Sequence, residues 1–144
     1  VSLQAVLPYG SSARFEHVEA TPTCGCAGCA GAHGLRFHVG EEVRFHAAGL
    51  CGAGENAYEQ TLGMFGLAES LLKQSGMEFR DVVRTWIHLR EIDRDYEDLN
   101  RARRAFFGMR GIDPVPASTG TRPPTVSTAA ALSNSARILN PTLL

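Results

Sequence analysis

The sequence lacks a long hydrophobic run, and this absence removes membrane-spanning proteins from consideration. No stretch approaches the roughly 20 consecutive apolar residues that a transmembrane helix needs. Residues 1–10 carry no basic side chain, and their apolar core is too short for a signal peptide. The chain begins with Val1 rather than methionine, so we expect its native start to lie upstream. We therefore expect a cytoplasmic protein that does not bind a membrane.

The sequence also lacks an excess of charge of either sign. It has 14 lysine and arginine residues against 15 aspartate and glutamate residues, which gives a net charge of -1. We therefore expect no general electrostatic attraction to nucleic acid. Of its 144 residues, 44% are hydrophobic, as in ordinary globular proteins. This length favours a single domain over residues 1–144, which can bury a core without help from a metal or a disulfide.

Cysteine is scarce, and most of it is gathered in one stretch. Three of the four cysteines fall within residues 21–34, a predicted loop rich in glycine and alanine that has no helical or strand periodicity. The spacings C-x-C, C-x2-C and C-x3-H would allow a tetrahedral zinc site of three thiolates and one imidazole. The four candidate ligands are Cys24, Cys26, Cys29 and His33. Two alternatives stay open, namely reduced thiols without a role and a disulfide, and no other cofactor is expected.

Hydrophobic periodicity predicts strands and helices in a definite order. Apolar residues recur at three- and four-residue spacing from about 55 to 75 and from 96 to 107, which is typical of amphipathic helices. Period-two alternation and β-branched residues indicate strands elsewhere. We expect strands at 14–20, 35–39, 43–48 and 81–89, a proline-rich connection at 112–124 and a weak strand within 125–139. Residues 121–144 are thus either the last strand of the fold or a divergent tail.

Local signals refine the two predicted helices. Asp95 is the candidate N-cap of the second helix, and Gly76 is the candidate C-cap of the first. Gly63 and Gly66 are poor helix formers, and we interpret them as sites where the first helix packs closely on a sheet. The order of the elements predicts an α+β fold, with a single, mostly antiparallel sheet and both helices packed on one face.

The clearest predicted strand, 81–89, carries a chemically distinctive face. Arg84, Trp86 and His88 alternate with a second set of side chains, which we expect to face the helices. That second set is Val83, Thr85, Ile87 and Leu89. An arginine beside an aromatic ring and a titratable imidazole suggests binding of a small anion. The alternative is packing between subunits, with Arg84 in an ion pair.

Several short motifs resemble one known superfamily. They are ENAYEQT at 55–61, LAE at 67–69, Gly76, DVVR at 81–84, Leu89, LN at 99–100, FF at 106–107 and PAS at 116–118. In this order they resemble the YjgF/Rid superfamily, which includes RidA, over about residues 43–120. The resemblance implies a chorismate-mutase-like α+β fold, a homotrimer and ligand pockets between subunits. Residues 84–96 also resemble a branch near the chorismatase-type enzymes of secondary metabolism.

The resemblance implies deaminase activity, but this sequence differs from the deaminase pattern at two positions. Deaminating members of the superfamily hydrolyse enamines and imines, and an arginine directly after Pro-Ala holds the substrate carboxylate in a bidentate contact. Here Ser118 stands at that position, and the nearest arginine is Arg122. A glutamate often found on the last strand is also missing, since residues 112–144 contain none.

Two classes of function therefore stay open. The first is an enzyme, deaminase-like or chorismatase-like, that acts on a carboxylate-bearing imine, enamine or related metabolite in a specialised biosynthetic pathway. The second is a non-catalytic trimer that binds a small acid or a partner protein. The candidate catalytic residues are Cys51, Tyr58 and His88, and the candidate substrate-binding residues are Arg84, Trp86, Ser118, Arg122 and Glu55. Cys51 lies before a predicted helix, where the pKa of a thiol is lowered, but it would also fit as a small buried residue.

Overall fold

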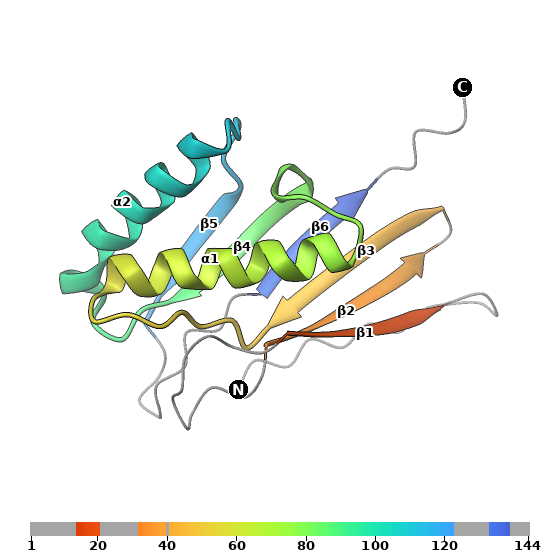
Figure 1. Ribbon diagram of the computed structural model, residues 1–144, viewed down its shortest axis with the longest axis horizontal. Coiled ribbons are helices and arrows are strands. Elements are labelled where there is room, and N and C mark those ends of the chain that lie inside the picture. Colours follow the sequence, from red (N-terminus) through yellow and green to blue (C-terminus); the bar gives the residue numbers. More distant parts are fainter. Residues whose placement is uncertain (1–13, 21–31, 40, 123–132, 139–144) are drawn as a thin grey trace.

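The computed structural model describes residues 14–20, 32–39, 41–122 and 133–138, which form one sheet and two long helices (Figure 1). In chain order the elements are β1 Phe15–Ala20, β2 Ala32–Val39, β3 Glu42–Ala48, α1 Ala57–Gln74, the short 3₁₀-helix η1 Phe79–Asp81, β4 Val82–His88, α2 Ile92–Met109, β5 Ala117–Thr121 and β6 Ser133–Ile138. No helix in these ranges is long and apolar enough to cross a membrane.

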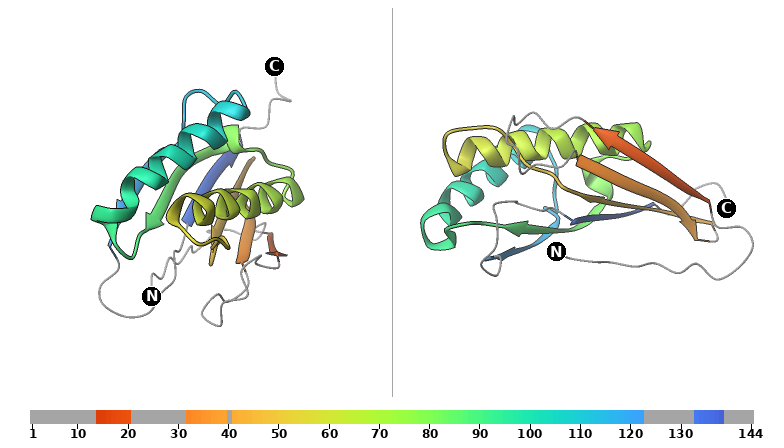
Figure 2. Two further views of the ribbon diagram at one scale, coloured as in Figure 1. Left: turned by 60° about the vertical axis from the view of Figure 1, so that its left-hand side comes forward. Right: turned by 90° about the horizontal axis from the view of Figure 1, so that it is seen from below.

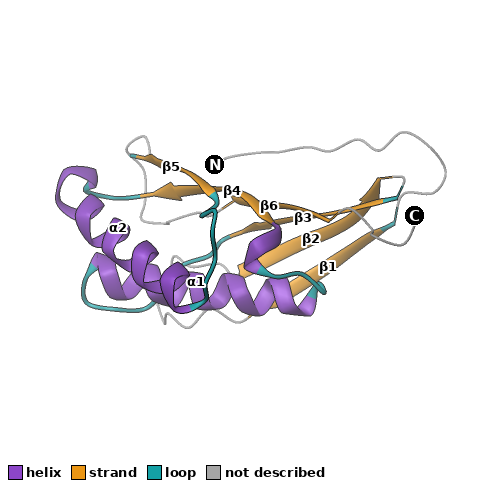
Figure 3. Cartoon of the chain, turned by 90° about the horizontal axis from the view of Figure 1, so that it is seen from above, coloured by secondary structure: helices purple, strands orange, loops and turns teal. Residues whose placement is uncertain are grey.

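The sheet is six-stranded, in the order β1-β2-β3-β6-β4-β5. All neighbouring strands are antiparallel except β4 and β5, which are parallel. The last strand, β6, lies between β3 and β4 and joins the two halves of the sheet. Figures 2 and 3 show both helices on the same side of the sheet. The prediction of an α+β fold with a mostly antiparallel sheet and two helices on one face is therefore confirmed.

Helix α1 has clear signals at both ends. The Oδ1 atom of Asn56, the N-cap, accepts a hydrogen bond of 2.9 Å from the backbone N–H of Glu59. The carboxylate of Glu59 in turn accepts from the backbone N–H of Glu55 at 2.9 Å, which satisfies a second free donor. Gly76 follows the last turn with φ 72°, a conformation that favours glycine. Helix α1 ends at Gln74 with Ser75 as its C-cap, so the predicted end of the helix near residue 75 is confirmed, but Gly76 is the residue after the cap and not the cap itself.

Helix α2 begins one turn earlier than predicted. It starts at Ile92, after Glu91 as N-cap, so the assignment of Asp95 as the N-cap was wrong. Ile92 packs against the core, which extends the buried face into the segment that looked like a charged turn. Asp93 and Asp95 lie in the first turn, where the helix dipole favours negative charge. The acidic residues therefore mark the first turn of this helix and not the loop before it.

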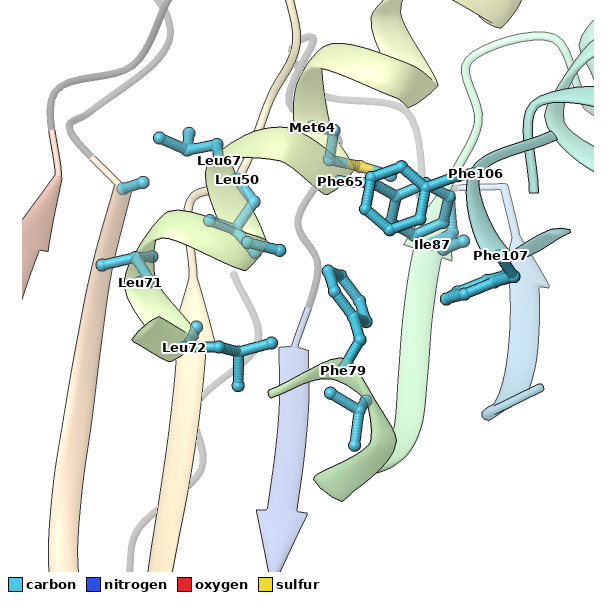
Figure 4. Packing of buried hydrophobic residues seen from close by; sticks show 14 of the residues in the cluster. Leu50, Met64, Phe65, Leu67, Leu71, Leu72, Phe79, Ile87, Phe106 and Phe107 are labelled. Carbon is cyan, nitrogen blue, oxygen red and sulfur yellow. The ribbon is translucent and has the colours of Figure 1, made fainter. Parts of the chain in front are cut away.

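The core lies between the helices and the sheet and is rich in aromatic rings (Figure 4). Phe65 of α1 lies 5.1 Å from Phe106 and 5.3 Å from Phe107 of α2, measured between ring centroids. Phe79 of η1 completes the group, 6.0 Å from Phe65. The residues labelled in Figure 4 are Leu50, Met64, Phe65, Leu67, Leu71, Leu72, Phe79, Ile87, Phe106 and Phe107. Burying each large side chain contributes about 1.5–3 kcal/mol, so this layer holds the helices on the sheet.

An ion pair at the edge of this core also ties α1 to α2. Arg110, directly after α2, donates two hydrogen bonds of 2.8 and 3.0 Å to the carboxylate of Glu69 on α1. Its guanidinium carbon lies 3.5 Å from the centroid of the Phe106 ring. The hydrogen bonds from Arg110 lower the pKa of Glu69 below its ordinary value. Glu69 therefore stays ionised at neutral pH and fixes the two helices relative to each other.

A β-bulge in β4 changes one predicted side-chain orientation. Val82 is 5% exposed and belongs to the core, whereas Val83 is 56% exposed, so the predicted orientation of Val83 toward the helices was wrong. The pairing of β4 with β6 shifts between Val82 and Arg84, which inserts one extra residue and breaks the alternation. From Thr85 onward buried and half-buried residues alternate as predicted.

Two strand assignments also need correction. Strand β5 lies at Ala117–Thr121, within the segment 112–124 that we expected to be a connection without strands. Strand β2 begins at Ala32, inside the predicted loop 21–34. The weak strand prediction at 125–139 is confirmed in part, because β6 occupies Ser133–Ile138. Of the two interpretations of residues 121–144, the described part thus favours a last strand of the fold.

Candidate functional site

The face of the sheet opposite the helices carries the predicted trio of polar and aromatic residues on β4. Thr85 and Ile87 are 2% and 1% exposed beneath the helices, so Arg84, Trp86 and His88 project to the other side. The guanidinium carbon of Arg84 lies 5.6 Å from the centroid of the Trp86 ring. The structure therefore places the three residues together, as predicted.

The parallel neighbour β5 adds residues to the same face. Its register pairs Thr119 with Trp86 and Thr121 with His88. The Oγ1 atom of Thr121 lies 2.7 Å from Nδ1 of His88, so the hydroxyl group and the imidazole are hydrogen bonded. We refer to these residues as the β4–β5 strip: Arg84, Trp86, His88, Thr119 and Thr121. The strip combines a cation, an aromatic ring and an imidazole whose position is fixed.

Arg84 has an uncompensated charge in the part of the chain that the structure describes. Its side chain is exposed, and its one described interaction is with the ring of Trp86. Several other arginines are paired with carboxylates, among them Arg44 with Glu42 at 3.0 Å and Arg110 with Glu69 at 2.8 Å. No aspartate or glutamate within the described ranges forms an ion pair with Arg84. A guanidinium in this situation is available to an external anion.

A second group of rings lies on the same face, on strands β1 to β3. The ring of Phe37 stacks on His46 at 5.3 Å with an interplanar angle of 15°, and Phe15 lies 6.1 Å from Phe37. Ser135 of β6 pairs with His46 on one side and with Arg84 on the other, so two strand spacings separate these residues. His46 and Arg84 are thus roughly 10 Å apart across the sheet.

His46 is held in its neutral form. Burial lowers its pKa below the ordinary value of 6.5, and the positive charge of the neighbouring Arg44 lowers it further. The Nδ1 atom is buried and has no hydrogen-bond partner within the described residues. Protonation of the imidazole is therefore disfavoured in the folded protein.

This environment predicts that the protein loses stability as the pH falls below about 6.5. The unfolded chain takes up the proton on His46 first, so the free energy of unfolding decreases until the pH passes the lower pKa of the folded state. We expect His46→Phe to lose less stability than the wild type between pH 7 and 5, measured by urea unfolding. Arg44→Gln is the matched control, and it should weaken the effect only in part because burial is the larger cause. An equal loss in the wild type and His46→Phe would contradict the prediction.

The loop before α1 packs against the helix and carries Cys51. A methyl group on Gly52 would lie 1.9 Å from the carbonyl oxygen of Gln60, so only glycine allows this close approach. Gly63 faces Gly52, and a methyl group on Gly66 would meet nothing within 4 Å. The expectation that both glycines pack on the sheet was therefore wrong. Cys51 is 9% exposed and is disulfide-bonded, so in this state its sulfur is not a nucleophile.

The structure does not bring Tyr58 and Glu55 to the β4–β5 strip. The guanidinium carbon of Arg101 on α2 lies 4.3 Å from the centroid of the Tyr58 ring, so Tyr58 belongs to the helix layer. Glu55 is exposed at the start of α1 on the same side. Helix α1 lies on the opposite side of the sheet from the β4–β5 strip, because both helices cover the same face (Figure 3).

Ser118 and Arg122 also lie apart from the strip. Ser118 pairs with Thr85, whose side chain is buried on the helix-facing side, so Ser118 faces away from Arg84. Arg122 follows β5 directly and forms an exposed ion pair of 3.0 Å with Asp93. Sequence reasoning missed Thr121 altogether, because nothing in a short stretch of small polar residues signals that it pairs with His88.

The predicted zinc ligands lie mostly outside the described residues. This applies to Cys24, Cys26 and Cys29, whereas His33 lies on β2 opposite Ala48 of β3. Within the described part of the chain, no group of three or more side chains that bind metals comes together. The zinc site therefore stays a prediction.

Comparisons with known proteins agree with the architecture. No protein-family model matches the sequence, and a search of curated proteins finds no match. Among solved structures, a member of the YjgF/YER057c/UK114 family from Mycobacterium tuberculosis matches with a TM-score of 0.55 and 20% identity, over 85% of this chain and 100% of that chain. RidA from an Antarctic Psychrobacter matches with a TM-score of 0.53 and 16% identity, over 83% of this chain and 94% of that chain.

A third solved structure with a similar fold belongs to a protein of unknown function. A protein of unknown function from Pseudomonas aeruginosa matches with a TM-score of 0.57 and 18% identity, over 88% of this chain and 95% of that chain. The fold and the strip define an α+β protein with a cationic and aromatic strip on the sheet face away from the helices. That fold is the one found in YjgF and RidA proteins, so the resemblance noted in the sequence is confirmed for the fold. The resemblance to the chorismatase branch stays a prediction.

Proposed function

We propose that the protein is a small-molecule enzyme of the Rid type. It acts on a carboxylate-bearing imine, enamine or related metabolite in a specialised biosynthetic pathway, in a cleft between the subunits of a homotrimer. The observation that carries this proposal is the exposed guanidinium of Arg84, which has an aromatic neighbour and no carboxylate partner among the described residues. A carboxylate would accept two hydrogen bonds from it in the planar geometry that guanidinium groups favour.

Exposed apolar side chains among the described residues support the participation of other subunits. Phe15 and Val83 are large apolar residues that are 43% and 56% exposed. Contact with a second copy of the chain would remove this surface from water and would lower the local dielectric constant around Arg84. The charge interaction with a bound carboxylate would be stronger there than on an open surface.

His88 is the group in the strip that can move a proton. In imine hydrolysis, water adds to the carbon of the C=N bond, a proton passes to the nitrogen, the C–N bond breaks and ammonia leaves a carbonyl product. An imidazole has one nitrogen that can accept a proton and one that can donate a proton, so it can carry that proton from the water to the leaving nitrogen. Thr121 holds the ring through Nδ1 and leaves Nε2 for this task.

A second function, binding of a small acid without turnover, is favoured by one specific observation. Ser118 occupies the position where deaminating relatives carry the carboxylate-binding arginine, and it lies on the helix-facing side of the sheet. Ammonia release separates the two functions. We expect release from an enamine made from serine or threonine to exceed solvent hydrolysis, and no excess would leave binding alone.

Ligand binding at Arg84 is tested with Arg84→Gln. A carboxylate at 100 times its dissociation constant should stabilise the wild type by about 2.7 kcal/mol in thermal unfolding. Loss of charged hydrogen bonds worth about 1.5–3 kcal/mol should weaken binding roughly 10- to 150-fold in Arg84→Gln. Arg122→Gln is the matched control, because Arg122 already pairs with Asp93, and it should bind as the wild type does. Equal affinity in Arg84→Gln and the wild type would remove Arg84 from the site.

A further inference from the structure

The β4–β5 strip also indicates what kind of carboxylate fits it, an inference that rests on the function proposed above. We propose that the ligand is a planar, conjugated carboxylic acid with a polar group on the far side of its ring. The carboxylate binds Arg84, the ring lies against Trp86 and the polar group meets His88, with Thr121 as a positioning residue for the imidazole.

The order of the residues along β4 indicates where the carboxylate and the ring of the ligand lie. Residues at every second position of a strand are roughly 6.6 Å apart, so Arg84, Trp86 and His88 follow one another along β4. The guanidinium carbon of Arg84 is 5.6 Å from the centroid of the Trp86 ring. The guanidinium lies over the indole, so a ring attached to a carboxylate on this guanidinium is near the part of the indole that the guanidinium leaves uncovered.

The indole of Trp86 favours a flat, aromatic ring over a saturated ring in the ligand. Trp86 is half-buried, so one part of its ring system stays accessible on the sheet face. Aromatic pairs gain energy beyond the burial of area, which a saturated ring of equal size does not. Its neighbour on β5 is Thr119, whose side chain is much smaller than the indole.

The hydrogen bond between His88 and Thr121 leaves one imidazole nitrogen of His88 available to a polar group of the ligand. The hydroxyl of Thr121 engages Nδ1 at 2.7 Å, either as donor or as acceptor. In both tautomers the Nε2 atom remains for a ligand, and it has no other partner in the described ranges. Since Arg84 and His88 lie at opposite ends of the row, a ligand that uses both has its carboxylate and its polar group on opposite sides of the ring.

The ring preference is tested with benzoate and cyclohexanecarboxylate, which share the carboxylate and the number of ring atoms. We expect benzoate to bind the wild type about 2- to 12-fold more tightly, the ratio that an aromatic pair supplies. Trp86 is the only tryptophan in the chain, so its fluorescence should change more with benzoate. In calorimetry Trp86→Leu should bind both acids about equally, while Trp86→Phe keeps a preference for benzoate. Equal binding by the wild type, or a preference that persists in Trp86→Leu, would overturn the inference.

The role of Thr121 is tested with 4-carbamoylbenzoate, whose amide both donates and accepts hydrogen bonds. We expect it to bind more tightly than benzoate, and Thr121→Val to remove this gain while the preference for a flat ring stays. Long-range ¹H–¹⁵N NMR should show a changed tautomer ratio of His88 in Thr121→Val and the original ratio in Thr121→Ser. An unchanged ratio together with an unchanged gain would exclude positioning by Thr121.

The outcomes also separate this inference from the proposed function. If neither benzoate nor cyclohexanecarboxylate binds the wild type, the site at Arg84 and the inference fall together. If both acids bind equally and both are lost in Arg84→Gln, the carboxylate site stands and only the planar ring is excluded.

Discussion

Replacing Phe65 by alanine is expected to lower the free energy of unfolding by about 3–5 kcal/mol, as for other buried phenylalanines. The side chain is 0% exposed, and its ring lies 5.1 Å from Phe106 and 5.3 Å from Phe107 on α2. It is also 6.0 Å from Phe79 on η1. Because these neighbours belong to two other elements, they cannot all move into the cavity that the variant leaves. The cost should therefore include a cavity contribution as well as the loss of buried area.

Urea unfolding followed by circular dichroism measures this effect. Phe65→Leu keeps much of the volume and should cost less than the alanine variant. Met109→Ala is the control, because Met109 is 73% exposed at the end of α2 and its loss should change stability by no more than about 0.5 kcal/mol. A loss below about 1 kcal/mol in Phe65→Ala would show that the aromatic cluster does not hold the helices on the sheet.

The elements that the sequence predicted best are those whose pattern is local. Helix α1 runs from Ala57 to Gln74, close to the expected 55–75, because its buried side chains recur with the helical period. The row of Arg84, Trp86 and His88 was equally predictable, since alternation along one strand fixes the face of each side chain. Both inferences need only residues that are near one another in the sequence.

The features that were missed depend on pairing between distant segments. Strand β5 has the sequence ASTGT, which has little strand propensity, and it is ordered by parallel pairing with β4. The bulge that exposes Val83 arises from the register of β4 against β6, some 50 residues further along the chain. No periodicity within a single segment encodes either feature.

In the candidate site, too, the features that the sequence did not predict depend on how distant segments pair. Tyr58 and Glu55 were assigned to the site because their loop was expected to border it, yet the start of α1 lies on the other side of the sheet. Thr121 joins the strip only through the parallel register of β5 with β4. His46 comes to the same face because β6 lies between β3 and β4. A one-dimensional pattern assigns a face to a residue, but the order of strands decides its neighbours.

Replacing Cys51 by alanine is expected to lower the free energy of unfolding by about 2–4 kcal/mol under non-reducing conditions, the usual effect of a lost disulfide. Cys51 is disulfide-bonded and 9% exposed, in the loop that packs on α1. The bond restricts the unfolded chain, so its removal stabilises the unfolded state more than it changes the folded one. Urea unfolding with and without dithiothreitol measures the effect, because the reductant should bring the wild type close to the variant.

Peptide mapping of the non-reduced protein identifies the partner and bears on the zinc prediction. The other cysteines of the sequence are Cys24, Cys26 and Cys29, which lie outside the described residues. A Cys3His site with His33 needs all three as thiolates, so a disulfide to any of them would leave two. We therefore expect stoichiometric zinc binding only in the reduced protein. Alkylation of Cys51 in the native, non-reduced protein would contradict the disulfide, and a stability difference that reductant leaves unchanged would assign the effect to packing.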